Sequence, residues 1–186
     1  MIPIKNKRKS LEVTIEEMRN FAFNYIEKFA PSKQQLKTYL LKKYLKSKTP
    51  VNRGNISSLI DIVLEDLEKS KFINDKFYSE SKAKSLIQRG SSINKIRNYL
   101  VGKGVGEKYI KNTIEQIREN NDDQDFFSAI KICKKKRIGP SREEDNRPLF
   151  YKKDMGVLAR SGFDFEVSKR VMDLDKDEYL KIINLL

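Results

Sequence analysis

The side chains that most often carry acid–base and metal chemistry are nearly absent from this chain. It contains no histidine and a single cysteine, Cys133. Histidine is the commonest general base and neutral metal ligand, and structural zinc sites use four cysteine or histidine ligands. A zinc site of the usual ligand set is therefore excluded. Because no pair of carboxylates stands out, we expect no catalytic residues, no bound metal and no cofactor, and we predict that the protein is not an enzyme.

Three other features resemble chemical sites, and each has a structural interpretation that we favour. Residues 102–106 (GKGVG) lack the preceding strand of a phosphate-binding loop, so we interpret them as a helix stop that needs a positive φ. The acidic residues at 122–125 have no glutamate at calcium-loop spacing, which favours helix capping over metal binding. Cys133 lies beside lysines that would lower the pKa of a thiol, but a small packed residue is the favoured interpretation.

Basic side chains are the remaining candidates for function. The chain has 39 Lys and Arg against 26 Asp and Glu, a formal net charge of +13. The first 50 residues hold 12 of the basic residues and only 4 of the acidic ones. An AT-rich genome would also raise the lysine content, but it does not explain this asymmetry along the chain. A basic surface of this size is typical of proteins that contact nucleic acid or another polyanion.

The basic residues gather in three groups at similar positions of three successive helical segments. A solvated surface explains any one group alone, whereas the repetition favours a single basic groove that binds phosphates or an acidic protein. The predicted groove residues are Lys33, Lys37, Lys42, Lys43 and Lys46 in the first group, Arg89, Lys95, Arg97 and Lys103 in the second, and Lys134, Lys135 and Arg137 in the third.

Helices must position these groups. Apolar residues recur at spacings of three and four along most of the chain, as in amphipathic helices that bury one stripe. Capping boxes that begin at Thr14 and Ser32 mark two helix starts. The apolar stripe is thinnest in the helix predicted at 76–89. We predict an all-α protein with a disordered basic arm at 1–12 and three-helix repeats at 13–72, 73–120 and 121–186, the last with an extra C-terminal helix.

Internal similarity supports the repeats. Residues 98–114 (NYLVGKGVGEKYIKNTI) align without a gap with residues 156–172 (GVLARSGFDFEVSKRVM), so that Gly104 matches Gly162. In both segments an apolar helix end is followed by a glycine, an apolar residue, a short polar link and a new helix. Self-similarity of this kind is typical of tandem helical repeats.

The composition also bears on location. No stretch approaches the ~18 apolar residues of a membrane span, and the basic start of the chain is not followed by the apolar run of a secretory signal. A single cysteine forbids an internal disulfide, which suits a reducing compartment. We expect a cytoplasmic monomer with no membrane contact.

Four motifs, taken in order, resemble the RecX family of bacterial recombination regulators. Residues 73–78 (INDKFY), followed by the Arg89-Gly90 pair, are similar to the family's LDD-x-x-F-A turn and Arg-rich helix. Residues 96–104 (IRNYLVGKG) resemble its R-x-x-L-x-x-K-G motif, and residues 158–165 (LARSGFDF) its closing L-x-R-x-G-F motif. The opening helix pair matches at Ala22, Ser32, Leu36 and Leu40. The resemblance covers residues 14–172, with Lys and Asn in place of many family arginines and a Lys-rich loop at 46–55.

This resemblance implies a curved, elongated array of three three-helix units. It also implies binding to the groove of the RecA filament on single-stranded DNA, with inhibition of ATP hydrolysis and strand exchange. Its partners would be RecA and single-stranded DNA, contacted directly or through RecA. The setting would be DNA repair, homologous recombination and the SOS response.

Two other hypotheses stay open. The protein could bind DNA without RecA, either independently of sequence or through one three-helix unit used as a helix-turn-helix reader. The dense lysines around Lys37 count against base reading, because lysines so placed favour phosphates. Alternatively, it could be a structural adaptor whose basic face is only compositional, which predicts no salt-dependent partner.

Overall fold

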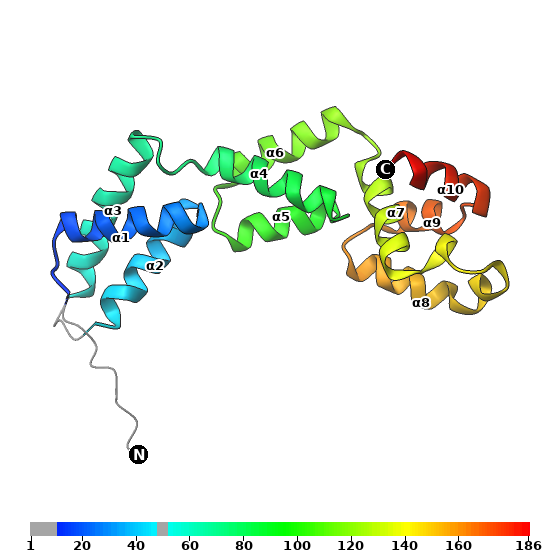
Figure 1. Cartoon of the computed structure of the whole chain (residues 1–186), viewed down its shortest axis with the longest axis horizontal. Coiled ribbons are helices and arrows are strands. Elements are labelled where there is room, and N and C mark those ends of the chain that lie inside the picture. The colour runs from blue at the N-terminus through cyan, green and yellow to red at the C-terminus, as the bar shows by residue number, and fades with distance from the viewer. Residues whose placement is uncertain (1–10, 48–51) are drawn as a thin grey trace, which may run out of the picture. The chain divides into compact units, whose positions relative to one another are not determined.

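The computed structural model describes residues 11–47 and 52–186 (Figure 1). Within these ranges the chain forms ten α-helices and two short 3₁₀ helices, and no strand. The all-α prediction is therefore confirmed, and the arrangement in three repeats is compatible with the structure but stays a prediction. The chain divides into two compact units. The first contains the described residues up to Tyr78 together with 103–105, and the second contains 79–102 and 106–186.

The first unit is built on three helices and the start of a fourth, in the order α1 (Ile15–Phe29), α2 (Lys33–Leu45), α3 (Arg53–Lys69) and α4 (Asp75–Gln88). Fully buried side chains of the first three helices form its core, and they are Met18, Ala22, Leu36, Leu40, Tyr44, Ile60 and Val63. Leu11 packs against this core although the predicted disordered arm includes it. The rest of that arm at 1–10 and part of the predicted loop at 46–55 lie outside the described residues.

Local chemistry sets the helix ends of the first unit where the sequence predicts them. The backbone N–H of Glu17 donates to the hydroxyl of Thr14 at 3.2 Å. At the start of α2, Ser32 and Gln35 form a complete capping box, each side chain accepting from the other's backbone N–H. Ala30 ends α1 in the left-handed conformation, with φ 41°, before Pro31. The α1–α2 connection is therefore short and fixed.

The second unit continues from α4 through six further helices. They are α5 (Ile93–Gly102), α6 (Glu107–Asn120), α7 (Gln124–Lys136), α8 (Arg147–Arg160), α9 (Phe165–Met172) and α10 (Lys176–Leu185). Ala129, Ile130, Leu158 and Val171 lie at the centre of its core, each fully buried. Two 3₁₀ helices, Gly139–Ser141 and Glu144–Asn146, occupy the link from α7 to α8. Tyr179 of α10 packs into the same core, so the last helix belongs to this unit.

Both units contain the same type of joint between a helix start and a helix stop. In the first unit, the Ser32 hydroxyl donates to the carbonyl oxygen of Lys103 at 2.6 Å. The N–H of Lys33, the next residue, donates to the carboxylate of Asp75 at 2.8 Å. Free N–H groups at the start of a helix need acceptors and favour negative charge. Asp75 therefore caps α2, although it lies on α4.

The second unit repeats these contacts with different residues. The Ser92 hydroxyl donates to the carbonyl oxygen of Ser161 at 3.0 Å, and the N–H of Ile93 donates to Asp125 at 2.8 Å. Burial raises the pKa of Asp125, and the bond from Ile93 opposes that rise. The predicted capping role of the acidic stretch thus holds for Asp125, but the helix that it caps is α5 and not its own.

The matched glycines follow the carbonyl groups of these two joints. Gly104 has φ 70° and Gly162 has φ 91°, in the left-handed region that only glycine enters without cost. A Cβ on Gly162 would lie 2.5 Å from the hydroxyl oxygen of Ser92, and one on Gly104 would lie 2.4 Å from the side chain of Gln34. The glycines therefore let each helix stop approach the start of the partner helix. The predicted positive φ at Gly104 is confirmed.

Candidate polyanion-binding surfaces

The lysines of α2 divide between two faces of that helix. Lys33 and Lys37 turn towards α3, where Lys33 pairs with Glu68 at 2.6 Å and Lys37 pairs with Asp61. The hydrogen bond that the Lys33 ammonium donates to the Glu68 carboxylate raises the pKa of Lys33 above its ordinary value. Because a carboxylate already neutralises each of these cations, they are weaker candidates for phosphate contact than the sequence suggested.

The other three lysines of this group keep their charge available. Lys42 and Lys46 are exposed and make no ion pair with a described residue. The ammonium of Lys43 lies 3.7 Å from the ring centre of Phe21, a cation–π contact that holds the charge beside an aromatic surface. The C-terminal half of α2 is therefore the part of the first unit most suited to a polyanion.

In the second group, the predicted residues have unequal exposure. Arg97 donates to Glu107 at 2.8 Å in an exposed ion pair, whereas Arg89 and Lys95 are exposed without an ion pair to the described residues. Lys103 is partly buried, and its carbonyl oxygen takes part in the first joint. Arg89 and Lys95 are thus the stronger candidates of the second group.

The third group lies at the C-terminal end of α7. Lys134, Lys135 and Arg137 are exposed, and Arg137 ends the helix with φ 54°. Lys134 lines a surface hollow of about 310 Å³ together with Lys131, Gln88, Ile183 and Leu186. This hollow adds Lys131, which the sequence did not single out, to the cations of this end of α7.

Within the second unit, the structure brings Arg89 of the second group close to the third group, whereas Lys103 of the second group belongs to the first unit. The turn that contains Arg89 and Gly90 lies against α7, where a Cβ on Gly90 would be 3.1 Å from the Cβ of Lys131. Gln88, one residue before Arg89, lines the same hollow as Lys134. The first group belongs to the other unit. The single groove along all three groups therefore stays a prediction.

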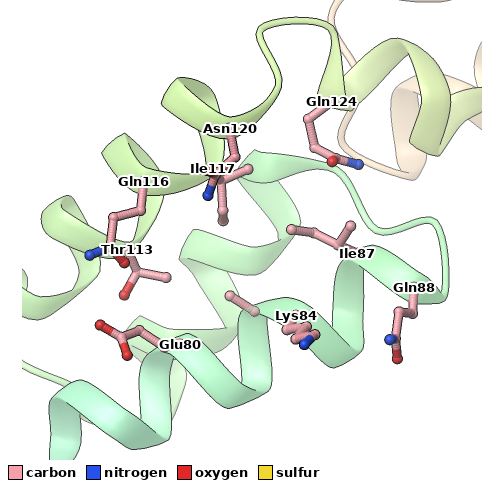
Figure 2. Close-up of a pocket in the computed structure, with 10 residues that line it drawn as sticks. Glu80, Lys84, Ile87, Gln88, Thr113, Gln116, Ile117, Asn120 and Gln124 are labelled. Atoms are coloured by element: carbon pink, nitrogen blue, oxygen red, sulfur yellow. The ribbon is translucent and has the colours of Figure 1, made fainter.

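An open groove of about 480 Å³ lies between α4 and α6 in the second unit (Figure 2). Its apolar lining comes from Ala83, Ile87 and Ile117, and amide side chains surround this lining. The amides are Gln88, Gln116, Asn120 and Gln124. The sequence indicated that α4 is only partly covered, because its apolar stripe is the thinnest of the predicted helices. In agreement, Phe77 on that helix is 69% exposed. Lys84, which the sequence places with the second basic group, is the one basic residue among the described residues that line the groove.

A buried ion pair was missed by sequence reasoning. Asp154 of α8 is fully buried and accepts from Nε of Arg142 at 2.6 Å and from the N–H of Gly139 at 2.8 Å. Burial alone would raise the pKa of Asp154, but these donors lower it below its ordinary value. Arg142 also lies over the ring of Phe150, at 4.3 Å. These contacts fix the α7–α8 link and therefore position the end of α7.

Cys133 lies in the core of the second unit, and Asp123 takes part in an ion pair. Cys133 is fully buried, and burial raises the pKa of its thiol to about 12, so the suggested lowering by nearby lysines is wrong. Asp123 pairs with Arg170 at 2.9 Å, which lowers its pKa. In the described ranges no group of three or more acidic or cysteine side chains is arranged to hold a metal ion.

No helix within the described ranges has the length and apolar character needed to cross a membrane.

Three similar proteins from different bacteria carry the same name. No protein-family model matches the chain. It is 29% identical to a regulatory protein RecX of Myxococcus xanthus, over 91% of each chain. It is also 22% identical to a regulatory protein RecX of Agrobacterium fabrum, over 89% of this chain and 87% of the relative. A third protein of this name, from Clostridioides difficile, is 24% identical over 94% of this chain and 82% of the relative.

The fold agrees with these relatives. The crystal structure of a regulatory protein RecX superposes with a TM-score of 0.60, covering 86% of this chain and 74% of that one, at 18% sequence identity. This similarity shows a shared fold. The family resemblance predicted from the four sequence motifs is confirmed.

Proposed function

We propose that this chain, which resembles the RecX regulatory proteins along about nine-tenths of its length, regulates the RecA recombinase. In this proposal it binds in the groove of the RecA filament on single-stranded DNA and inhibits ATP hydrolysis and strand exchange. The observation that carries the proposal is the match to relatives named regulatory protein RecX, over 91% of both chains in the Myxococcus xanthus case.

In the proposed mechanism, the protein acts by binding in the groove and does not catalyse a reaction. The helical units would lie along the filament groove, where they hinder extension of the filament and movement between its subunits. The exposed cations that lack ion pairs to described residues supply the attraction to phosphates or acidic protein. They are Lys42 and Lys46 in the first unit, and Arg89, Lys95, Lys134, Lys135 and Arg137 in the second. Contacts of this kind depend on charge and not on base sequence.

A binding experiment tests the proposal directly. Fluorescence anisotropy of a labelled oligonucleotide, single-stranded or duplex, is measured with and without RecA and ATP at physiological salt. We expect the protein to bind RecA-coated single strands more tightly than either bare DNA. Equal binding to bare duplex and to RecA filaments would instead support a DNA-binding protein that acts without RecA, and no binding to the filaments would contradict the proposal.

Charge removal tests which surface is used. Replacing Lys42 and Lys46 by alanine should weaken filament binding. If both contact single-strand phosphates, the negative slope of log affinity against log salt should become less steep by about 1.4. Lys108→Ala with Lys181→Ala is the matched control, because these lysines are also exposed and lie outside the predicted groups. An equal loss in both double variants would show that only net charge matters.

A further inference from the structure

An aromatic ladder lies along the seam between α1 and α2 in the first unit. The rings of Tyr25 and Tyr39 are stacked, with their centres 4.0 Å apart and their planes 13° from parallel. Phe29 continues the ladder, with its ring centre 4.8 Å from that of Tyr25. Three aromatic rings from two helices thus form one continuous series that ends at Phe29.

Phe29 has no role in the core that would explain its position. Phe21, Tyr25 and Tyr39 pack against the buried core of the first unit, but Phe29 is not among the residues that do so. It is the last residue of α1, and its side chain is 53% exposed. The exposed ring leaves apolar surface that a stacking partner can cover. The ladder therefore ends on an open ring.

Positive charge accompanies the ladder along its length. The ammonium of Lys28 lies 5.5 Å from the ring centre of Phe29, and that of Lys43 lies 3.7 Å from Phe21 and 5.8 Å from Tyr39. Lys42 and Lys46 are exposed on the same half of α2. Helix α2 carries no carboxylate, and Glu27 is the one acidic residue from Phe21 to the end of α1.

Aromatic rings beside a row of cations match the chemistry of a single nucleic-acid strand. Bases stack on aromatic side chains whatever their sequence, and lysines along the path bind the phosphates. In a duplex, the faces of the bases are already stacked on each other and are not available to such rings. From Phe21 to Phe29 the helix rises about 12 Å, which matches roughly three nucleotides at the ~3.4 Å spacing of a stacked strand.

We propose that this aromatic–lysine seam is a binding site for unpaired nucleotides, with a base stacking on the open ring of Phe29 and the phosphates held by Lys28, Lys42, Lys43 and Lys46. The role of this site in the cell rests on the proposed regulation of RecA, in which the seam would bind the single strand directly. The contact itself does not need RecA, so it can be tested without it.

The test uses the full chain and a fluorescein-labelled deoxythymidine 15-mer without RecA, at low salt. Phe29→Ala should weaken binding by about 5- to 150-fold, the range for loss of one stacked base. Phe29→Tyr should stay within about twofold of the unaltered chain, because tyrosine also stacks. Phe77→Ala is the matched control, since Phe77 is also an exposed aromatic residue on a helix. Circular dichroism would verify that each variant is folded.

Two further readouts separate stacking from simple charge attraction. The chain contains no tryptophan, so its tyrosine emission is observable, and binding should quench it as a base joins the ladder. We expect the affinity for a duplex of the same length to be weaker, and Phe29→Ala should not change it. The proposal is overturned if Phe29→Ala binds the single strand as the unaltered chain does, if it loses single strand and duplex equally, or if the unaltered chain does not bind the single strand. Since RecA is absent, none of these results bears on filament regulation.

Discussion

At the scale of single residues, Asp154 is a buried charge within the second unit. It is fully buried, and two nitrogens of Arg142 donate to it at 2.6 and 3.0 Å. Taking one partner from a buried pair leaves the other charge without compensation, which costs about 3 kcal/mol. Arg142 would lose its carboxylate, and the α7–α8 link would lose its anchor.

Asp154→Asn should therefore lower the free energy of unfolding by about 3 kcal/mol at pH 7, measured by urea denaturation. Because the folded protein lowers the pKa of Asp154, the stabilisation is present above the unfolded pKa of about 3.9 and is lost as the pH falls through the folded value. The difference in the free energy of unfolding between the unaltered chain and Asp154→Asn should then become smaller below about pH 4. Asp145→Asn, an exposed change in the same link, is the control and should be near neutral. If this difference in the free energy of unfolding stayed constant down to pH 2.5, the stabilising role of the Asp154 carboxylate would be contradicted.

The missed and the correct residue predictions have different physical origins. Thr14, Ser32 and Gly104 were predictable, because caps and left-handed turns depend on a residue and its immediate neighbours. The Asp154–Arg142 pair was not, because its geometry depends on how the 3₁₀ helices fold back on α8. Cys133 shows the same limit: its sequence neighbours are lysines, but its spatial surroundings are a buried core that raises the thiol pKa.

At the scale of helices, the recurrent joint is the feature that links sequence similarity to structure. The internal similarity correctly marked Gly104 and Gly162 as helix stops. What it did not predict is the partner of each stop, since the hydroxyls of Ser32 and Ser92 donate to the carbonyl groups that precede those glycines. Those partners lie about 70 residues away along the chain, at separations of 71 and 69. Periodicity identifies a helix, but it does not determine which other helix packs against its end.

Gly162→Ala tests the joint. A Cβ would be placed at φ 91° and 2.5 Å from the Ser92 hydroxyl oxygen, so we expect a loss of about 2 kcal/mol in the free energy of unfolding. Gly102→Ala is a control in the other matched segment, because its Cβ would meet no atom within 4 Å. That change should be neutral or slightly stabilising, since alanine favours a helix over glycine. Equal urea midpoints for the two variants would show that the joint does not depend on this glycine.

At the scale of the whole molecule, the sequence predicted the helical class and the family resemblance correctly. That the three basic groups line one groove stays a prediction. Ion pairs with α3 engage Lys33 and Lys37, and an ion pair with Glu107 engages Arg97. A helical pattern indicates which residues share a face, but it does not show that a carboxylate from another helix will neutralise them. The exposed cations that lack such ion pairs are therefore the surfaces to which the proposed function assigns binding.

The most direct test of the central claim is the rate of ATP hydrolysis by RecA on single-stranded DNA as this protein is added at physiological salt. We predict that the rate falls in a saturable way, and that the Lys42→Ala, Lys46→Ala double variant needs more protein than the Lys108→Ala, Lys181→Ala control for the same inhibition. A rate that stays unchanged when the protein is present in excess over RecA would contradict the claim that this chain regulates RecA by inhibiting it.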